Sequence, residues 1–169
     1  MKRNTPLYPI SNALHKEEEM SYVSLLYHIV FRPYGSQPVI NPDHAEDLYR
    51  YISGFINSRD SQLCQIGGMP DHIHLLVQIA PTQSVAAFMR DLKTSANKYM
   101  TDHRQWFPDF YKWGKSYCAI TVSASNMPNV VSYIQHQKQH HAHKSYADEL
   151  RDICKAYGIN IDEQYFLKE

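Results

Sequence analysis

The sequence predicts an α+β fold: a ferredoxin-like βαββαβ antiparallel sheet with helices on one face, followed by C-terminal helices. Two kinds of segment carry this prediction, and they occur in the order β-α-β-β-α-β. In one kind apolar and polar residues alternate, as in strands; in the other apolar residues recur every three or four positions, as in helices. The chain has 169 residues, 43% of them hydrophobic, which suits one domain with a single core.

Residues typical of element ends mark where the first strand stops and where the first helix begins. Residues 22–31 (YVSLLYHIVF) alternate and are rich in β-branched and aromatic residues, and this strand stops at Arg32-Pro33. Asn41-Pro42 has the form of a helix N-cap followed by proline at the first helical position, so we expect a helix to begin there. The apolar stripe of this helix consists of Ala45, Leu48, Ile52, Phe55 and Ile56.

Two more strands, a helix and a fourth strand complete the predicted sheet. Residues 61–69 (SQLCQIGGM) form the second strand, and a turn predicted over residues 67–71 pairs it antiparallel with a third strand, 72–79. The second helix has apolar positions at Val85, Phe88, Met89, Leu92, Ala96 and Tyr99. After an aromatic loop, residues 115–123 (KSYCAITVS) predict the fourth strand.

Two helices are expected after the sheet. The first starts near Asn126 and places Tyr133 and Gln137 on one side of the helix. These two residues are one turn apart, so their Cβ atoms should lie about 5 to 6 Å from each other. The second helix covers residues 145–158 and ends at Gly158.

Composition narrows the possible functions. Seventeen basic and seventeen acidic residues leave no net charge, which argues against a protein that binds polyanions by bulk attraction. Cys64, Cys118 and Cys154 lack metal-finger spacing and suit reduced thiols. No apolar run reaches the roughly 18 to 20 residues of a membrane span, so we expect a cytoplasmic protein. Residues 1–20 lack periodicity and predict a loose extension, leaving 21–169 as a single domain.

The third strand carries an unusual pattern, two histidines separated by one residue in GGMPDHIHLLVQI. Because side chains alternate along a strand, His72 and His74 share one face, and Ile73 and Leu75 share the other. A lone histidine on a strand is usually a packed or hydrogen-bonded residue. Two neighbouring imidazoles can also bind one divalent ion through their ring nitrogens when a third ligand approaches. Spacing alone leaves both interpretations open.

Several motifs, taken in order, resemble one known family. PDHIH followed by LLV, then VAAFMRDLKTSANKYM, WGKSY and VVSYIQHQKQHH together resemble the single-tyrosine HUH transposases of the IS200/IS605 insertion-sequence group, including their REP-associated relatives. The similarity runs from about Tyr22 to the C-terminus. It implies the same ferredoxin-like sheet that the periodicity predicts.

The resemblance also implies an enzyme and its site. It implies that Tyr133 is the nucleophile and that His72, His74 and Gln137 bind Mg²⁺ or Mn²⁺. The implied activity is that of a DNA transposase, a metal-dependent single-strand endonuclease and strand transferase that works through a covalent 5′-phosphotyrosine. A tyrosine hydroxyl, with a pKa of about 10, is a weak nucleophile, so a divalent ion that polarises the phosphate makes chemical sense.

The partner implied by the resemblance is single-stranded DNA with hairpin structure, bound by a homodimer at the nucleoid, with no membrane involved. The candidate DNA contacts are Arg90, Lys93, Lys98, Lys112 and Lys115 for phosphates and Trp113 for base stacking. The histidine-rich segment from His136 to His143 is either a metal-binding cluster or, by default, a solvated helix end.

Three other functions stay open. A replication initiator or conjugative relaxase shares the histidine pair, but those proteins tend to place the tyrosine in other sequence contexts. A catalytically inactive or domesticated protein could bind DNA hairpins without cutting them, although the set of Tyr133, Gln137 and the two histidines is complete. A ferredoxin-like metal-sensing domain would use the histidine-rich segment and need no tyrosine.

Overall fold

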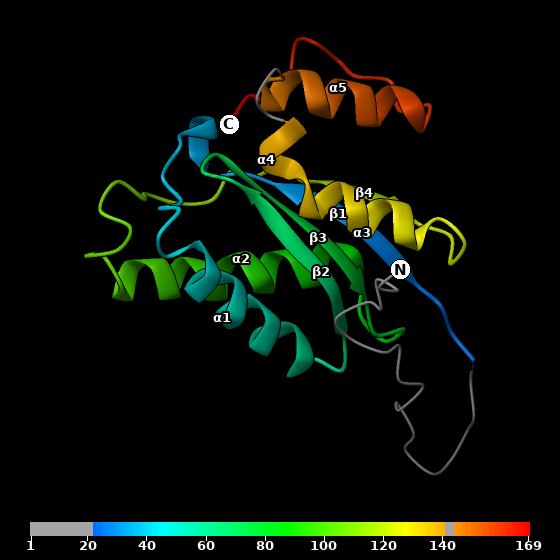
Figure 1. Ribbon diagram of the computed structural model, residues 1–169, viewed down its shortest axis with the longest axis horizontal. Coiled ribbons are helices and arrows are strands. Elements are labelled where there is room, and N and C mark those ends of the chain that lie inside the picture. The colour runs from blue at the N-terminus through cyan, green and yellow to red at the C-terminus, as the bar shows by residue number, and fades with distance from the viewer. Residues whose placement is uncertain (1–21, 141–143) are drawn as a thin grey trace, which may run out of the picture.

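The computed structural model describes residues 22–140 and 144–169 (Figure 1). The loose extension expected over residues 1–20 lies outside the described residues, as do positions 141–143 of the histidine-rich segment. Within the described part, no helix is both long enough and apolar enough to cross a membrane.

The centre of the fold is one four-stranded sheet. Its strands are β1 (Leu26–Phe31), β2 (Gln62–Met69), β3 (His72–Gln78) and β4 (Cys118–Thr121), in the spatial order β2-β3-β1-β4. All three neighbouring pairs are antiparallel. Together with the element order, this confirms the ferredoxin-like prediction, with β1 and β4 shorter than the alternation indicated.

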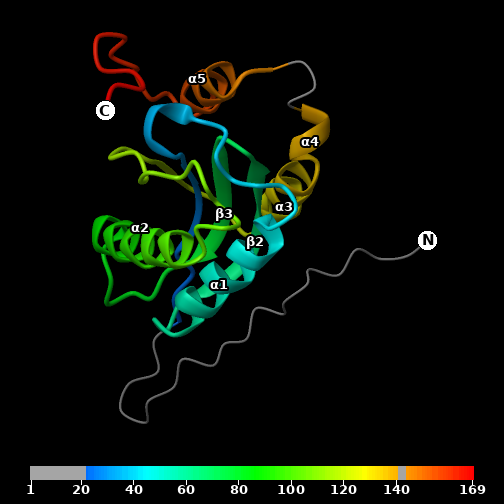
Figure 2. The same ribbon diagram turned by 90° about the vertical axis from the view of Figure 1, so that its left-hand side faces the viewer.

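Helices cover both faces of this sheet (Figures 1 and 2). On one face lie α1 (Ala45–Asn57) and α2 (Val85–Asp102), the two helices of the βαββαβ unit. On the other lie α3 (Met127–Gln135), α4 (Gln137–His140) and α5 (Tyr146–Ala156), the C-terminal helices. A single 3-10 turn, Tyr34–Ser36, follows β1.

Strand alternation divides the buried residues between the two faces. Ile73, Leu75 and Val77 of β3 belong to the main core under α1 and α2. Leu76 faces the opposite way and packs in a second cluster with α3 residues such as Ile134. The even positions of β3 therefore face the C-terminal helices, which places the two histidines on that side, as the alternation predicts.

Helix α1 begins three residues after the position expected for it, with His44 as its N-cap in place of Asn41. The side-chain oxygen of Asn41 accepts a hydrogen bond from the Asp43 amide at 3.0 Å, and its carbonyl accepts one from the His44 amide at 3.1 Å. Asn41 thus caps a turn that precedes the helix.

Gly67 and Gly68 belong to β2, which corrects the prediction that they form a turn. The turn is confined to Pro70 and Asp71. A Cβ atom on Gly67 would lie 2.9 Å from the Ile134 carbonyl oxygen of α3, and one on Gly68 would lie 2.2 Å from the His72 carbonyl oxygen. Glycine is present because two backbones approach β2 closely, one of them from α3.

The helix expected to carry both Tyr133 and Gln137 is interrupted. Helix α3 ends at Gln135, His136 adopts φ −102° and ψ 19°, and Gln137 begins α4. The imidazole of His136 lies 2.7 Å from the Ser132 carbonyl oxygen, which also accepts a hydrogen bond from the His136 amide at 3.1 Å. The last helix ends as predicted, with Gly158 at φ 66° just after it.

Candidate metal and nucleophile site

Two buried imidazoles form the floor of the site. His72 and His74 stand side by side on β3, each with 0% of its surface exposed and with ring centroids 5.0 Å apart. The main core occupies the other face of this strand, so both rings point toward the C-terminal helices.

Each imidazole has its Nδ1 atom engaged by a neighbour. Nδ1 of His72 lies 2.7 Å from Oδ1 of Asp71, and Nδ1 of His74 lies 2.9 Å from Nε2 of His28 on β1. Such contacts fix the orientation of an imidazole and leave Nε2 as the atom available for a ligand. Both Nε2 atoms face the same small volume.

A carboxylate from α5 fills that volume. Oε2 of Glu149 lies 3.3 Å from Nε2 of His72 and 3.4 Å from Nε2 of His74. The side-chain oxygen of Gln137 lies 3.4 Å from the same nitrogen of His72, and the Gln137 amide donates a hydrogen bond to Oε1 of Glu149 at 2.9 Å. The amide expected from the sequence is therefore present at the histidine pair, together with a carboxylate that was not expected.

Tyr133 completes the group from α3. Its hydroxyl donates a hydrogen bond to Oε1 of Glu149, and its ring centroid lies 5.8 Å from that of His74. The ring also lines a shallow hollow of about 360 Å³ with Asn129, Ser132 and His136. Tyr133 thus lies at the boundary between the buried site and the protein surface.

Burial and charge set the protonation of these groups. Burial acts to lower the pKa of His72, but its hydrogen bonds to the Asp71 and Glu149 carboxylates outweigh burial and raise the pKa to about 9. Burial acts to raise the pKa of Glu149, and its contacts with His72 and His74 outweigh this and lower the pKa, so the carboxylate is ionised. Burial, with Glu149 as a further cause, raises the pKa of Tyr133 above its ordinary value.

The donor set fits a divalent cation. One ligand atom from each of His72, His74 and Glu149 lies within 4.8 Å of the others, and all three residues are buried. Two imidazole nitrogens, a carboxylate oxygen and the Gln137 amide oxygen are ligand atoms that can coordinate Mg²⁺, Mn²⁺ or Zn²⁺. The coordination geometry would decide which of these metals binds. The engaged Nδ1 atoms supply the supporting contacts that such sites use.

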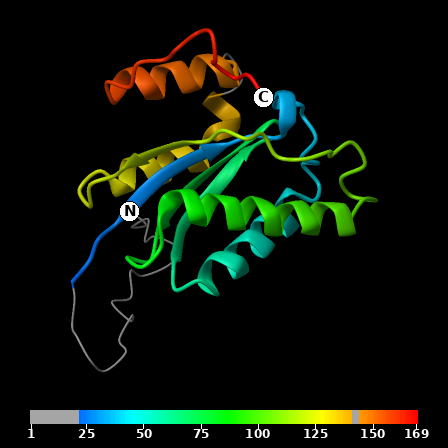
Figure 3. The same ribbon diagram turned by 180° about the vertical axis from the view of Figure 1, so that it is seen from behind.

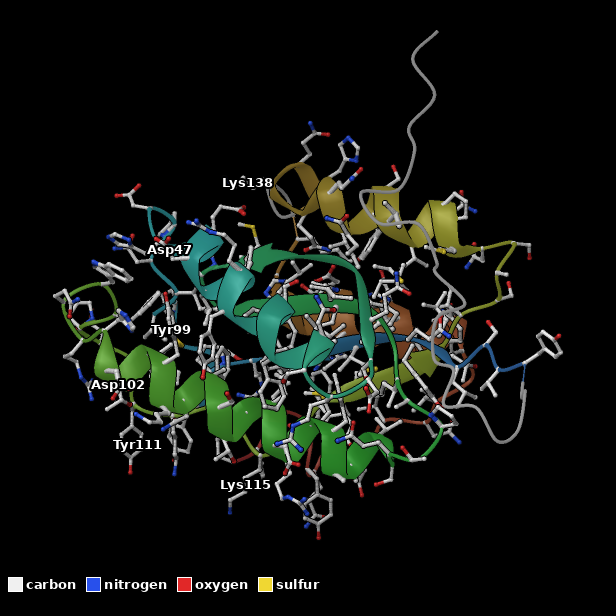
Figure 4. All side chains as sticks on the ribbon, turned by 90° about the horizontal axis from the view of Figure 1, so that it is seen from below. Asp47, Tyr99, Asp102, Tyr111, Lys115 and Lys138 are labelled. Carbon is white, nitrogen blue, oxygen red and sulfur yellow. The ribbon has the colours of Figure 1, made fainter. Side chains whose placement is uncertain are left out.

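The candidate DNA contacts lie elsewhere. Arg90, Lys93 and Lys98 belong to α2, on the face opposite Tyr133. In Figure 4, which looks onto α1 and α2, Lys115 projects at one margin of this face, and Lys138 of α4 lies at the opposite margin. None of the α2 residues approaches the histidine pair.

Two of these candidates already have structural roles. Lys93 donates hydrogen bonds to the carbonyl oxygens of Gly114, Lys115 and Ser116 at 2.8, 3.1 and 2.8 Å, and burial lowers its pKa to about 8. Trp113 is only 6% exposed and packs against Phe31 in the main core. In this arrangement the indole does not offer a face for base stacking.

Three residues of the site were missed by the sequence reasoning: His28, Asp71 and Glu149. His28 is on the even face of β1, the same face as His72 and His74 on β3. Glu149 lies three residues after Tyr146 and one before Leu150, inside the apolar stripe of the last helix. An acidic residue in an apolar stripe, opposite a strand with two histidines, was the signal available.

A tyrosine hydroxyl beside two imidazoles, an amide and a carboxylate, on a ferredoxin-like sheet, defines a site suited to phosphoryl transfer. Comparison with known families agrees with this class: the family described as "Transposase IS200 like" matches residues 21–137. This chain therefore belongs to the IS200-like transposase family.

Individual relatives support the same assignment. The chain is 27% identical over 133 residues to the ISDra2 transposase TnpA of Deinococcus radiodurans, covering 75% of this chain and 95% of that protein. It is 25% identical over 115 residues to the transposase for insertion sequence element IS200 of Salmonella typhimurium, covering 66% of this chain and 75% of that protein.

Two solved structures share the fold. A crystal structure of a transposase candidate from Deinococcus radiodurans R1 superposes with a TM-score of 0.57 at 24% identity, covering 73% of this chain and 98% of that one. A REP-associated tyrosine transposase bound to a REP hairpin superposes with a TM-score of 0.53 at 12% identity, covering 75% of this chain and 74% of that one.

Proposed function

We propose that this chain cleaves and rejoins single-stranded DNA through a covalent 5′-phosphotyrosine at Tyr133, with a divalent metal ion held by His72, His74 and Gln137. One observation carries the proposal: a single carboxylate, that of Glu149, contacts the Tyr133 hydroxyl, the Gln137 amide and both imidazoles. An anionic group is thus accommodated where the proposed nucleophile and the three proposed metal donors meet.

The reaction balances with one bond made and one broken. The Tyr133 oxygen attacks the phosphorus of a DNA phosphodiester, the P–O3′ bond breaks, and the phenolic proton is matched by a proton on the leaving 3′ oxygen. The products are a 5′-phosphotyrosine and a free 3′-OH. Because the phosphodiester energy is retained in the new ester, another 3′-OH can reverse the step and rejoin DNA without a nucleotide cofactor.

The residues of the chain supply position and charge for this step. Asp71 and His28 hold the two imidazoles with their Nε2 atoms inward, so the donors are arranged before substrate arrives. His72, His74 and Gln137 would hold a divalent ion there, and such an ion would supply Lewis-acid stabilisation of the charge that develops on the phosphate. The Glu149 carboxylate lies against the same two imidazoles and would add one negative charge beside a bound ion.

The proposed substrate is single-stranded DNA that contains a hairpin, and the proposed assembly is a homodimer. The solved REP-associated transposase that shares this fold is bound to a REP hairpin, which supports the choice of DNA for this chain. Balanced overall charge favours recognition by a local surface and by hairpin shape over bulk attraction to phosphate.

The test uses single-stranded oligonucleotides that tile both flanks of the gene encoding this chain, labelled at the 3′ end and incubated with the protein and Mn²⁺. We expect a labelled protein band that resists denaturation, because the 3′ part of the cut strand stays attached through its 5′ phosphate. Tyr133→Phe should lose this band and still shift the hairpin in a native gel. An adduct that forms equally with Tyr133→Phe contradicts the proposal, and hairpin binding without any adduct from the wild type indicates the inactive DNA-binding protein.

A further inference from the structure

We propose that Glu149 of α5 is a positioning residue that holds the Tyr133 hydroxyl beside the histidine pair. This inference rests on the proposed function and adds to it a residue that lies outside the family motifs, twelve residues beyond Gln137. Family membership is carried by residues 21–137, so the contribution of α5 comes from the structure of this chain alone.

The two oxygens of Glu149 divide their contacts between nucleophile and histidines. Oε1 accepts hydrogen bonds from the Tyr133 hydroxyl and from the Gln137 amide. Oε2 faces the Nε2 atoms of His72 and His74. An ionised carboxylate has about four acceptor positions on its two oxygens, so both sets of contacts can exist at once. Glu149 therefore connects the phenol to the imidazoles through a single rigid group.

The position of Glu149 in the helix points to a role in the site. It is 2% exposed and lies on the inward side of α5 with Tyr146, Leu150 and Cys154, all of which are buried. A buried carboxylate costs several kcal/mol unless it is paired, and an apolar residue of similar size would pack on this face without that cost. Helix packing alone gives no reason for a charge at this position.

The body of α5 is fixed against the sheet. Leu150 and Cys154 pack with Val30 of β1, and the Cys154 thiol contacts that of Cys118 on β4. The helix N-terminus is capped by Ser145, whose hydroxyl accepts a hydrogen bond from the Asp148 amide at 3.2 Å. These contacts set the orientation of the helix that carries Glu149.

The segment after α5 gives a second attachment. It returns toward the 3-10 turn that follows β1, as Figure 3 shows. There the buried guanidinium of Arg32 donates to the Leu167 carbonyl at 2.8 Å and pairs with Glu169 at 2.5 Å. With both the helix and the following segment attached to β1, Glu149 has a defined place over the histidines.

A phenol without this contact can rotate away. Tyr133 is half-buried and borders an open hollow, so other side-chain rotamers lead toward solvent. A nucleophile displaced by about 1 Å can lose on the order of 100-fold in rate. We expect Glu149→Ala to lower the rate of adduct formation by about 10- to 100-fold and to leave the KM for DNA unchanged, because Glu149 does not line the exposed surface.

The test combines kinetics with a measurement on the free protein. We would incorporate 3-fluorotyrosine at position 133 and record ¹⁹F spectra of the protein and of its Glu149→Ala and Glu149→Gln variants. Asp148→Asn is the matched control, because it changes an exposed acid on the same helix next to Glu149. Wild type and Asp148→Asn should give one shared resonance, Glu149→Ala a shifted and narrower one, and Glu149→Gln, whose amide oxygen still accepts from the phenol, an intermediate spectrum.

The outcomes separate this inference from the proposed function. A wild-type protein that gives no adduct with any oligonucleotide removes the proposed function, yet the fluorine spectra still report whether Glu149 holds Tyr133. A Glu149→Ala variant that forms adduct as fast as the wild type, or faster, overturns the inference alone. The inference also fails if Glu149→Ala leaves the fluorine resonance unchanged and lowers the Mn²⁺ affinity as much as His72→Ala does. Glu149 would then act as a metal ligand and would not hold the phenol.

Discussion

Nε2 of His28 lies 2.9 Å from Nδ1 of His74, across the antiparallel pair of β1 and β3. The two rings also stack, with centroids 5.1 Å apart. Since one of two facing imidazole nitrogens must be the donor and the other the acceptor, at most one of these rings can carry a second proton. This direct contact with a predicted metal ligand makes His28 part of the site.

We expect His28 to make the metal-free protein sensitive to acid. Burial, and then the neighbouring His74, lower the pKa of His28 to about 3, with Glu149 opposing them. An unfolded histidine titrates near 6.5, so between pH 6.5 and 3 the unfolded chain binds a proton that the folded chain does not. The contribution of His28 to the free energy of unfolding should therefore fall as the pH falls through this window, by about 2 to 3 kcal/mol between pH 7 and 4.5.

Urea unfolding in EDTA at pH 7 and at pH 4.5 measures this effect. His28→Gln keeps a polar side chain and removes the titration, so it should lose less stability than the wild type over the same interval. His103→Gln, which changes a histidine at the end of α2 on the other face, should behave as the wild type does. Equal losses for His28→Gln and the wild type would show that His28 does not titrate in this way.

Chelation should abolish DNA cleavage, and Mg²⁺ or Mn²⁺ should restore it. His72→Ala and His74→Ala should each lower adduct formation by at least 100-fold while the far-ultraviolet circular dichroism stays that of the wild type. Activity should fall because each substitution removes one metal ligand. The fold should persist because β3 still pairs with β1 and β2. Cleavage in excess EDTA, or variants that fail to fold, would indicate a structural role for the imidazoles.

The proposed nucleophile and its partners belong to one chain in this structure. Tyr133 hydrogen-bonds Glu149 of the same chain, and the histidines of that chain lie on the other oxygen of the carboxylate. We therefore expect a mixture of Tyr133→Phe and His72→Ala proteins to form no adduct, because neither chain holds a complete site. Recovery of activity in the mixture, with oligomer exchange verified by native mass spectrometry, would mean that the tyrosine serves the metal site of a second subunit.

Exposed lysines on the two faces should contribute differently to DNA binding. Lys138 is exposed and follows Gln137 directly, whereas Lys98 lies on α2 and pairs with Asp102. We expect Lys138→Ala to weaken hairpin binding and to reduce the salt dependence of the affinity by about one counterion. Lys98→Ala should leave both unchanged. The reverse result would place the DNA on α2, as the sequence reasoning did.

Much of the fold was predictable because its signals are local. Alternation along β1 and β3 and the apolar stripes of α1 and α2 depend on near neighbours in the sequence, and the structure confirms the elements that they predict. The bounds were less predictable. The glycines of β2 looked like a turn because glycine is common in turns. The actual reason for Gly67 is the approach of α3, a contact from a distant part of the chain, and the reason for Gly68 is the close backbone of His72 on β3.

The site was predictable only in part, for a similar reason. His72 and His74 are adjacent on one strand, so their closeness follows from strand geometry. Glu149 reaches them from a separate helix, and its place depends on how α5 packs on β1 and β4. The interruption at His136 was also hidden, since no proline or glycine marks it. Tertiary contacts decide both features, and periodicity does not report them.

The absence of a side chain at Gly67 has a consequence for the position of Tyr133, the proposed nucleophile. The Ile134 carbonyl rests almost directly on the β2 backbone, and Ile134 is the neighbour of Tyr133 in the chain. A methyl group added at Gly67 would push α3 away from the sheet by a fraction of an ångström, and the Tyr133 phenol would move with it. The missing side chain at position 67 therefore sets how closely α3, and with it the Tyr133 hydroxyl, can approach the sheet that carries the imidazoles.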